Sequence, residues 1–179
     1  DPDYGGLCTF IIFSQFGLTM RMGERMPKQI LANVQLFKNL GPEEINQISK
    51  ICQMVNISQG QAVFQEGEVA TAMYIVTYGS IKLCHTSANG EVVEVCTLGT
   101  GDHFGEMSFI DGKKRTAKAE TLENCQIVKI DYEKLQTMFD KYPLIAARFY
   151  RSISKSLSAR LNMTTHDLSF ARERNMKHH

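Results

Sequence analysis

Hydrophobic side chains change their spacing twice along this chain, and the changes predict three parts with different secondary structure. From Pro27 they recur at the spacing of an amphipathic helix, which Gly41-Pro42 is expected to end. A second helix is predicted to follow, because Glu43 and Glu44 would stand in its first turn, near the positive end of the helix dipole. We expect its buried face to consist of Ile45, Ile48, Ile51 and Cys52.

The middle of the chain is predicted to be β-structure. After Asn56, glycines recur between short runs rich in Val, Ile, Tyr and Phe, a pattern typical of an antiparallel sandwich or barrel. Asn89-Gly90 predicts a tight hairpin turn. The predicted strands include Ala62–Gln65, Met73–Tyr78, Ser80–His85, Glu91–Leu98, Lys114–Glu120 and Cys125–Ile130. We therefore expect a mainly β fold, an eight-stranded antiparallel roll of the jelly-roll type, with flanking helices.

The last third of the chain is predicted to be helical again. Asp131 is expected to cap one helix, which Pro143 ends, and a longer helix begins there. Along the longer helix a heptad seam is formed by Ile153, Leu157, Leu161, Thr164, Leu168 and Ala171. Such a narrow seam favours an interface between two helices over burial in a core. Packing of the whole helix on its own roll is the alternative.

Composition excludes several classes of protein. The 179 residues carry a net charge of only +1, which argues against nucleic-acid binding through bulk charge. The five cysteines form no C-x-x-C pair, so we expect no metal site, and free thiols fit the reducing cytoplasm. The apolar run Leu7–Phe13 is much shorter than the about 20 residues that cross a membrane, so no membrane span is expected.

The segment from Gly101 to Ala117 has the residues of an anion site. Gly105 would let the backbone approach a ligand, and the free N–H groups of a short helical turn after it would face an anion. Arg115, on the next strand, would hold the same anion with its planar guanidinium. Glu106 would repel a phosphate unless it accepts hydrogen bonds from hydroxyls such as those of a sugar. The pattern predicts a site for a nucleotide or a sugar phosphate.

The residues Phe104-Gly105-Glu106-Met107-Ser108, followed by Arg115-Thr116-Ala117, resemble the phosphate-binding cassette of cyclic nucleotide-binding domains. The order of elements is also similar to that family, in which N-terminal helices precede a glycine-punctuated roll and hinge and lid helices follow it. The resemblance covers about Pro27 to the end of the chain and implies a cyclic nucleotide-binding domain at 27–142 and a lid and dimerisation helix at 143–179. Residues 1–26 lie before it and are expected to form an arm whose origin is open.

The resemblance also implies a role for each cassette residue. Glu106 would accept a hydrogen bond from the ribose 2′-hydroxyl, and Arg115 would pair with the cyclic phosphate. The backbone N–H groups of Met107 and Ser108 would complete the phosphate site, and the Thr116 hydroxyl would reach the phosphate or the purine. Ser108 departs from the family, which most often has Ala there.

Further expectations concern two hydroxyl residues of the last helix and several residues in or near the cassette. Ala159–Thr165 resembles the catabolite-activator segment that places two hydroxyls against the purine, which would here be Thr164 and Thr165. Phe104, Met107 and Phe109 are expected to be core residues. His103 and His166 lack metal-ligand partners at suitable spacing and are expected to be surface or capping residues.

The predicted function is that of a ligand-gated sensor. It would bind cAMP, with cGMP as the rival because of Thr116, and a hinge after Ile130 would move the last helix, through which the chain would form a homodimer. No catalytic residues are predicted; a hydrogen-bonded Glu106 would have a lowered pKa and be a poor proton shuttle. The catabolite-activator branch continues into a helix-turn-helix, for which this chain, ending at His179, has no room, so direct DNA binding is not expected. The alternatives are a cytoplasmic regulatory domain of a channel or transporter, and an interaction domain with an empty pocket.

Overall fold

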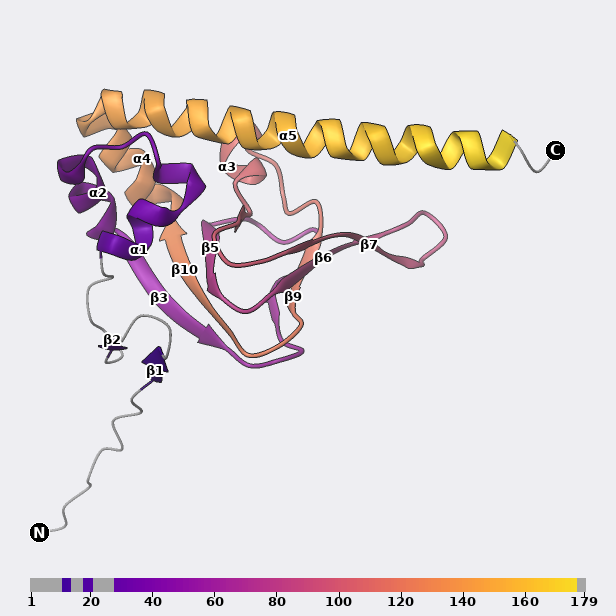
Figure 1. Cartoon of the computed structure of the whole chain (residues 1–179), viewed down its shortest axis with the longest axis horizontal. Helices are drawn as coiled ribbons and strands as arrows, with labels where there is room; N and C mark the ends of the chain where they lie inside the picture. Colours follow the sequence, from indigo (N-terminus) through magenta and orange to yellow (C-terminus); the bar gives the residue numbers. More distant parts are fainter. Residues whose placement is uncertain (1–10, 14–17, 21–27, 177–179) are drawn as a thin grey trace, which may run out of the picture.

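A computed structural model describes residues 11–13, 18–20 and 28–176 (Figure 1). Most of the predicted arm at 1–26 lies outside these residues. Its described parts are two short strands, β1 (Ile11–Phe13) and β2 (Leu18–Met20), which pair in antiparallel fashion.

Eight strands form two four-stranded antiparallel sheets, which confirms the predicted β-roll. One sheet has the order β3-β10-β5-β8 and the other β4-β9-β6-β7. Their bounds are β3 Cys52–Ile57, β4 Ala62–Phe64, β5 Ala72–Tyr78, β6 Ile81–Thr86, β7 Val92–Leu98, β8 His103–Phe104, β9 Lys118–Thr121 and β10 Cys125–Asp131. The Asn89-Gly90 turn joins β6 to β7, as expected, and Gly90 has a φ of 82°.

The first sheet separates two hydrophobic cores. Side chains alternate across a strand, so neighbours in β5 and β10 face opposite sides. Ile75 and Val128 pack into a core with the helices, whereas Val76 and Ile127 pack into the core between the sheets. Burial on both faces explains why the adjacent residues Ile75-Val76 and Ile127-Val128 are all apolar.

The N-terminal helical region is shorter than predicted. It consists of α1 (Lys28–Asn33), the 3₁₀ turn η1 (Gln35–Phe37) and α2 (Pro42–Ser49). The side chain of Glu44 accepts a hydrogen bond from the Gly41 N–H at 2.7 Å and so closes the start of α2. The assignment of Cys52 to this helix was wrong, because Cys52 begins β3 and pairs with Ile130 of β10. Ile51 and Cys52 still pack against the helical core, which is why they fitted a helical face.

Three helices complete the described fold: α3 (Met107–Asp111), α4 (Tyr132–Lys141) and α5 (Pro143–Met176). Asp131 stands at the N-cap of α4, but its side chain makes no cap hydrogen bond. It pairs instead with Lys129 at 2.8 Å and with Lys134 at 3.2 Å, so the expected capping role of the side chain was wrong.

Helix α5 combines the two alternatives that the sequence left open. Its first part, including Phe149 and Ile153, is buried against η1 and α4. Farther along, Leu161 is 66% exposed and Leu168 is 50% exposed, where the helix extends beyond the sandwich (Figure 1). The seam therefore packs on its own domain at its beginning and is exposed to solvent farther on. No helix in the described part of the chain has the length and apolar character needed to cross a membrane.

Candidate functional site

The predicted phosphate segment connects β8 to β9 and contains α3. Two glycines with positive φ, Gly105 at 76° and Gly112 at 68°, start and end the helical turn. A Cβ atom at Gly105 would lie only 2.7 Å from Nη1 of Arg115. Glycine is thus required here both by the backbone conformation and by the close approach of the guanidinium.

The Arg115 side chain lies beside Gly105, as its predicted role in holding an anion there requires, and it is only 5% exposed. Its guanidinium lies 4.0 Å from the centre of the Phe64 ring. Nη1 donates to the Gly105 carbonyl at 2.9 Å and to the Tyr132 hydroxyl at 3.1 Å, and Nη2 donates to the Ala72 carbonyl. Among the described residues, no carboxylate lies within 4 Å of this buried cation.

The strand predicted at Lys114–Glu120 begins later than expected. Arg115 precedes β9 and is not part of it. The main chain of Arg115 pairs instead with the loop after β4, since its N–H donates to the Glu68 carbonyl and its own carbonyl accepts from the Gly67 N–H. These loop contacts turn the guanidinium toward Gly105.

Glu106 is buried almost completely, at 1% exposure. Its Oε1 accepts a hydrogen bond from Nη1 of Arg160 at 2.9 Å, while its Oε2 has no hydrogen-bond partner. Burial raises the pKa of this carboxyl, against the opposing effects of Arg160 and Arg115. The expectation of a lowered pKa was therefore wrong, because loss of solvent outweighs the hydrogen bond from Arg160.

Arg160 of α5 is a site residue that the sequence analysis missed. Besides Glu106, its guanidinium contacts the main-chain carbonyl of His103. It lies in the segment Ala159–Thr165, in which the sequence analysis assigned roles only to Thr164 and Thr165. Its role depends on where α5 crosses the roll, which no local pattern reveals.

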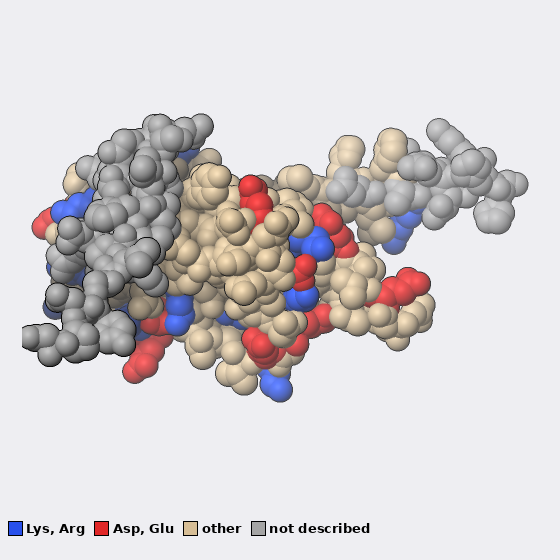
Figure 2. All heavy atoms as spheres, turned by 90° about the horizontal axis from the view of Figure 1, so that it is seen from below, with Lys and Arg blue, Asp and Glu red and all other residues tan. Residues whose placement is uncertain are grey.

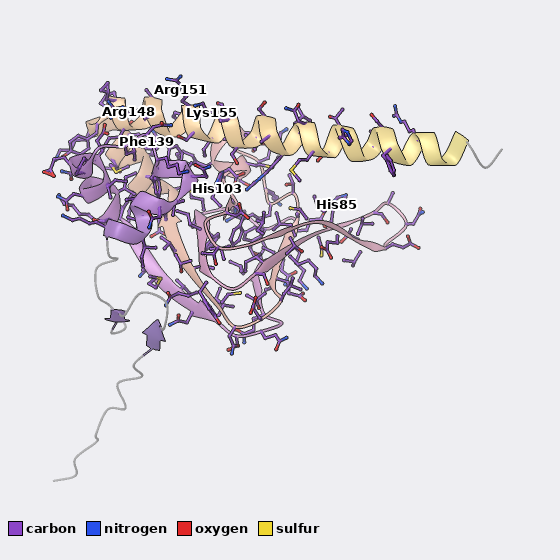
Figure 3. All side chains as sticks on the ribbon, in the orientation of Figure 1. His85, His103, Phe139, Arg148, Arg151 and Lys155 are labelled. Carbon is purple, nitrogen blue, oxygen red and sulfur yellow. The ribbon has the colours of Figure 1, made fainter. Side chains whose placement is uncertain are left out.

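His103 is buried rather than at the surface, so that expectation was wrong. It is 3% exposed, because β8 pairs with β5 at Ile75 and lies beneath α5 (Figure 3). Its Nε2 has no hydrogen-bond partner and lies 4.0 Å from Oε1 of Glu106. Burial, together with the nearby Arg160, lowers the pKa of this imidazole to about 4.

The cassette's remaining residues divide between core and surface. Phe104 is fully buried, as expected, and Phe109 packs partly buried against the helical core. Met107 is 49% exposed, so its assignment to the core was wrong; in a helix as short as α3 it faces solvent. Ser108 is buried and Thr116 is exposed.

The structure does not bring the two hydroxyls of α5 into contact with the cassette. Thr164 donates to the carbonyl of Arg160 at 3.1 Å, and Thr165 donates to that of Leu161 at 2.8 Å. Both side chains are exposed. Their assignment to the purine remains a prediction.

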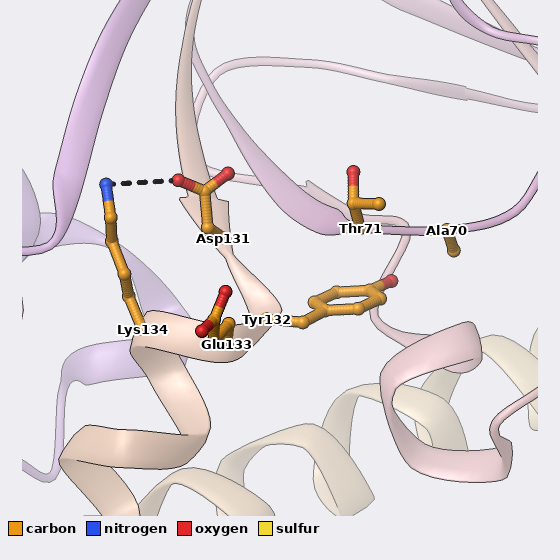
Figure 4. Close-up of a pocket in the computed structure, with 6 residues that line it drawn as sticks. All are labelled: Ala70, Thr71, Asp131, Tyr132, Glu133 and Lys134. Atoms are coloured by element: carbon orange, nitrogen blue, oxygen red, sulfur yellow. Dashed lines mark ion pairs between the residues drawn. The ribbon is translucent and has the colours of Figure 1, made fainter.

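Two surface hollows lie outside the cassette. One of about 370 Å³ is lined by residues at the start of α4, including Asp131 and Tyr132, where the hinge was predicted (Figure 4). The other, of about 330 Å³, lies between α2 and the start of α5. Tyr132 connects the first hollow to the cassette, because its hydroxyl donates to the Gly105 carbonyl.

Charge is mixed over the described surface. In Figure 2, acidic and basic side chains are interspersed and form no continuous basic patch on the visible face. Within the described residues, no three His, Cys, Asp or Glu side chains are grouped as metal ligands.

Comparison with known proteins identifies this arrangement. Residues 54–142 match the profile of the cyclic nucleotide-binding domain. This part of the chain belongs to the cyclic nucleotide-binding domain family. Its similarity to catabolite-activator-type regulators is also confirmed: the chain is 30% identical to a CRP-like cAMP-activated global transcriptional regulator of Mycobacterium tuberculosis over 142 residues, which cover 79% of this chain and 63% of that protein.

Solved cyclic nucleotide-binding folds are also similar to the domain. The catabolite activator protein of Thermus thermophilus aligns with a TM-score of 0.65 and 29% identity, covering 76% of this chain and 62% of that one. A cyclic nucleotide-binding domain from Methylobacillus flagellatus aligns with a TM-score of 0.71 at 19% identity, over 78% of each chain, which shows the fold alone.

Proteins of other kinds also match this chain, over smaller shares of their own length. A putative potassium channel protein of Rhodopseudomonas palustris is 28% identical over 78% of this chain but only 33% of its own length. A lysophospholipase of Phaeosphaeria nodorum is 24% identical over 83% of this chain and 10% of its own length. The chain spans 63% of the length of the Mycobacterium tuberculosis regulator and 56% of the length of a cyclic AMP receptor protein of Thermus thermophilus.

Proposed function

We propose that this cyclic nucleotide-binding domain is a ligand-gated sensor for a cyclic purine nucleotide, with cAMP favoured and cGMP possible. The observation that carries the proposal is the buried Arg115, which contacts no carboxylate among the described residues. A buried cation without a counter-ion is costly, and a cyclic phosphate would supply the missing charge. Glu106, beside it, keeps one oxygen free to accept from a ribose hydroxyl.

The remaining site assignments extend this proposal. The N–H groups of Met107 and Ser108 stand at the start of α3, where helical hydrogen bonds begin only with the N–H of Phe109. They would bind the phosphate together with Arg115. Thr116, Thr164 and Thr165 would face the base. The relatives named for cAMP support the choice of that nucleotide.

Binding would change the position of the last two helices. Arg115 now bonds to the Tyr132 hydroxyl at the start of α4, and Glu106 bonds to Arg160 of α5. A phosphate on Arg115 would compete with the Tyr132 contact, whereas a ribose hydroxyl would use Oε2 of Glu106, beside the Arg160 contact on Oε1. Phe109 of α3 lies 5.1 Å from Tyr132 and 6.4 Å from Tyr150 between ring centres, so movement of α3 would reach both helices.

The output of the sensor would pass through α5. Its exposed apolar residues support a homodimer formed through this helix, which would signal to an effector of the transcription-regulator type without DNA contacts from the described residues. The domain itself would be a cytoplasmic, non-enzymatic module. The similarity to a potassium channel protein supports the second candidate, a cytoplasmic regulatory domain of a channel or transporter.

Thermal unfolding of the purified chain with cAMP, cGMP and 5′-AMP tests the proposal. A ligand that binds only the folded state at 100 times its Kd adds about 2.7 kcal/mol of stability. We expect cAMP to raise Tm by about 5 to 10 °C under that condition, and 5′-AMP, which lacks the cyclic diester, to raise it much less. No shift with either cyclic nucleotide at millimolar concentration would contradict the proposal.

A further inference from the structure

Two buried polar atoms beside the proposed ribose site have no hydrogen-bond partner. They are Nε2 of His103 and Oε2 of Glu106, from side chains that are both more than nine-tenths buried. Proteins rarely leave buried polar atoms unpaired, and such atoms call for a specific explanation. Two of them on neighbouring side chains point to a polar group that binds between them.

The distance between the two side chains selects the kind of group. Nε2 of His103 lies 4.0 Å from Oε1 of Glu106, the oxygen that also accepts from Arg160, and this distance is too long for a direct hydrogen bond. An oxygen atom that approached both side chains to about 2.8 Å would bridge them. The separation therefore suits one bridging oxygen.

A hydroxyl group meets the hydrogen-bonding needs of both side chains. The Glu106 carboxylate only accepts hydrogen bonds, so the bridging group must donate to it. The imidazole is neutral at neutral pH, because burial and the nearby Arg160 oppose its protonation. With its proton on Nε2, it donates to the same oxygen. A hydroxyl donates and accepts at once, whereas a methylene at that place does neither.

His103 is held in position for such a contact. Its main chain pairs with Ile75 of β5, and its carbonyl accepts a hydrogen bond from Arg160 of α5. These two contacts hold the main chain of His103 between β5 and α5, below which Figure 3 shows this residue. A fixed donor loses little side-chain entropy when a ligand binds.

We infer that His103 is a specificity-determining residue that donates its Nε2 proton to the ligand hydroxyl bound by Glu106, and so selects ribonucleotides over 2′-deoxyribonucleotides. The inference rests on the proposed function. A purely structural histidine would instead support the fold and affect both classes of ligand equally.

Calorimetric titration with cAMP and with 2′-deoxy-cAMP separates these two roles. His103→Phe keeps a ring of similar size without the N–H, and His103→Gln keeps an N–H at similar reach. We expect His103→Phe to weaken cAMP binding about 3- to 12-fold, the effect of one hydrogen bond, and to leave 2′-deoxy-cAMP binding unchanged. His103→Gln should recover most of the lost affinity.

The possible results distinguish the role of His103 from the proposed function of the domain. Equal weakening of both ligands by His103→Phe, or no weakening of cAMP binding, would overturn the role of His103 while leaving the proposed function intact. If the unsubstituted chain binds neither ligand, the proposed function fails and this inference fails with it. If His103→Phe does not fold, ¹⁵N NMR of the imidazole in the unsubstituted chain tests the role of His103. We expect the Nε2 resonance to shift far more with cAMP than with 2′-deoxy-cAMP. Equal shifts with the two ligands would overturn the inference.

Discussion

The side chains of Arg115 and Glu106 are both buried near the start of α3, but they differ in how many of their polar atoms have hydrogen-bond partners. Arg115 lies over Phe64 and donates to carbonyl oxygens and a tyrosine hydroxyl. Glu106 has one oxygen paired with Arg160 and one unpaired. A sugar phosphate would complete both groups at once, with its anion on the arginine and a hydroxyl on the carboxylate.

His103 gives a prediction for stability against pH. Its folded-state pKa of about 4 lies below the ordinary value of 6.5, so between these values the unfolded chain binds more protons. Folding stability should therefore fall as the pH drops from 6.5 to 4, by about 3 kcal/mol from this group alone. The raised pKa of Glu106 acts in the opposite direction, because the folded state takes up a proton there as the pH falls.

The His103→Gln variant isolates the histidine contribution. Glu106 and Arg160, which face this side chain, are present in both proteins, as are the exposed histidines. Urea unfolding at pH 7, 5.5 and 4 should show the unsubstituted chain losing stability relative to the variant. Parallel pH dependence in the two proteins would contradict the neutral, buried state of His103.

At the scale of elements, α3 is tied to the last two helices by single contacts. Tyr132, the first residue of α4, bonds to the Gly105 carbonyl and accepts from Arg115. Arg160 connects α5 to Glu106 and to the His103 carbonyl. The contact of Tyr132 uses Arg115, which the proposed phosphate needs, so this contact opposes ligand binding.

Tyr132→Phe should therefore strengthen ligand binding. Removing the hydroxyl frees Arg115 from one competing partner and weakens the tie between α4 and the cassette, which shifts the population toward the binding-competent state. We expect a few-fold lower Kd for cAMP, measured by calorimetry, about the effect of one hydrogen bond. Tyr150→Phe is the matched control, and weaker binding in Tyr132→Phe would show that the hydroxyl supports the site instead.

Local sequence predicted the elements well where one pattern dominated. The apolar runs of β5 and β10 and the Asn89-Gly90 turn were unambiguous, and the cassette motif located Glu106 and Arg115. Strand β3 was missed, because its side chains alternate irregularly and its first residues continue the apolar face of α2. The pairing that makes it a strand is with β10, far along the chain.

The site residues that escaped prediction depend on long-range packing. His103 is buried only because β5 pairs with it on one side and α5 covers it on the other. Arg160 follows Glu106 by 54 residues in the chain and reaches it because α5 crosses the roll. Neither position follows from a motif, since both require the direction of a helix relative to the sandwich.

At the scale of the whole molecule, α5 joins the site to a surface suited to a second chain. The helix packs on η1 and α4, passes over α3 and extends beyond the roll (Figure 1). Its exposed part carries Leu161 and Leu168, seven residues apart on one face. An isolated apolar face of this kind is stabilised by burial against a partner.

Charges on this face should prevent the proposed dimer. We expect Leu161→Lys with Leu168→Lys to yield a monomer in sedimentation equilibrium, because like charges would meet across the seam and apolar burial would be lost. Asn162→Lys with His166→Lys adds two lysines off the seam and should leave the dimer intact. A monomer in the unsubstituted chain at high concentration would argue against a dimer through α5.

The most direct test of the central claim is a calorimetric titration of cAMP into the unsubstituted chain and into Arg115→Ala. The account predicts binding at micromolar Kd or tighter, and a loss of about 2–5 kcal/mol in Arg115→Ala, because the phosphate would lose its charged partner. That loss is at least about 30-fold in Kd, whereas Arg151→Ala, an exposed arginine on α5, should bind as the unsubstituted chain does. A loss below about 1 kcal/mol, within the range of a single neutral hydrogen bond, or no binding by the unsubstituted chain at millimolar cAMP, would contradict a phosphate site built on Arg115.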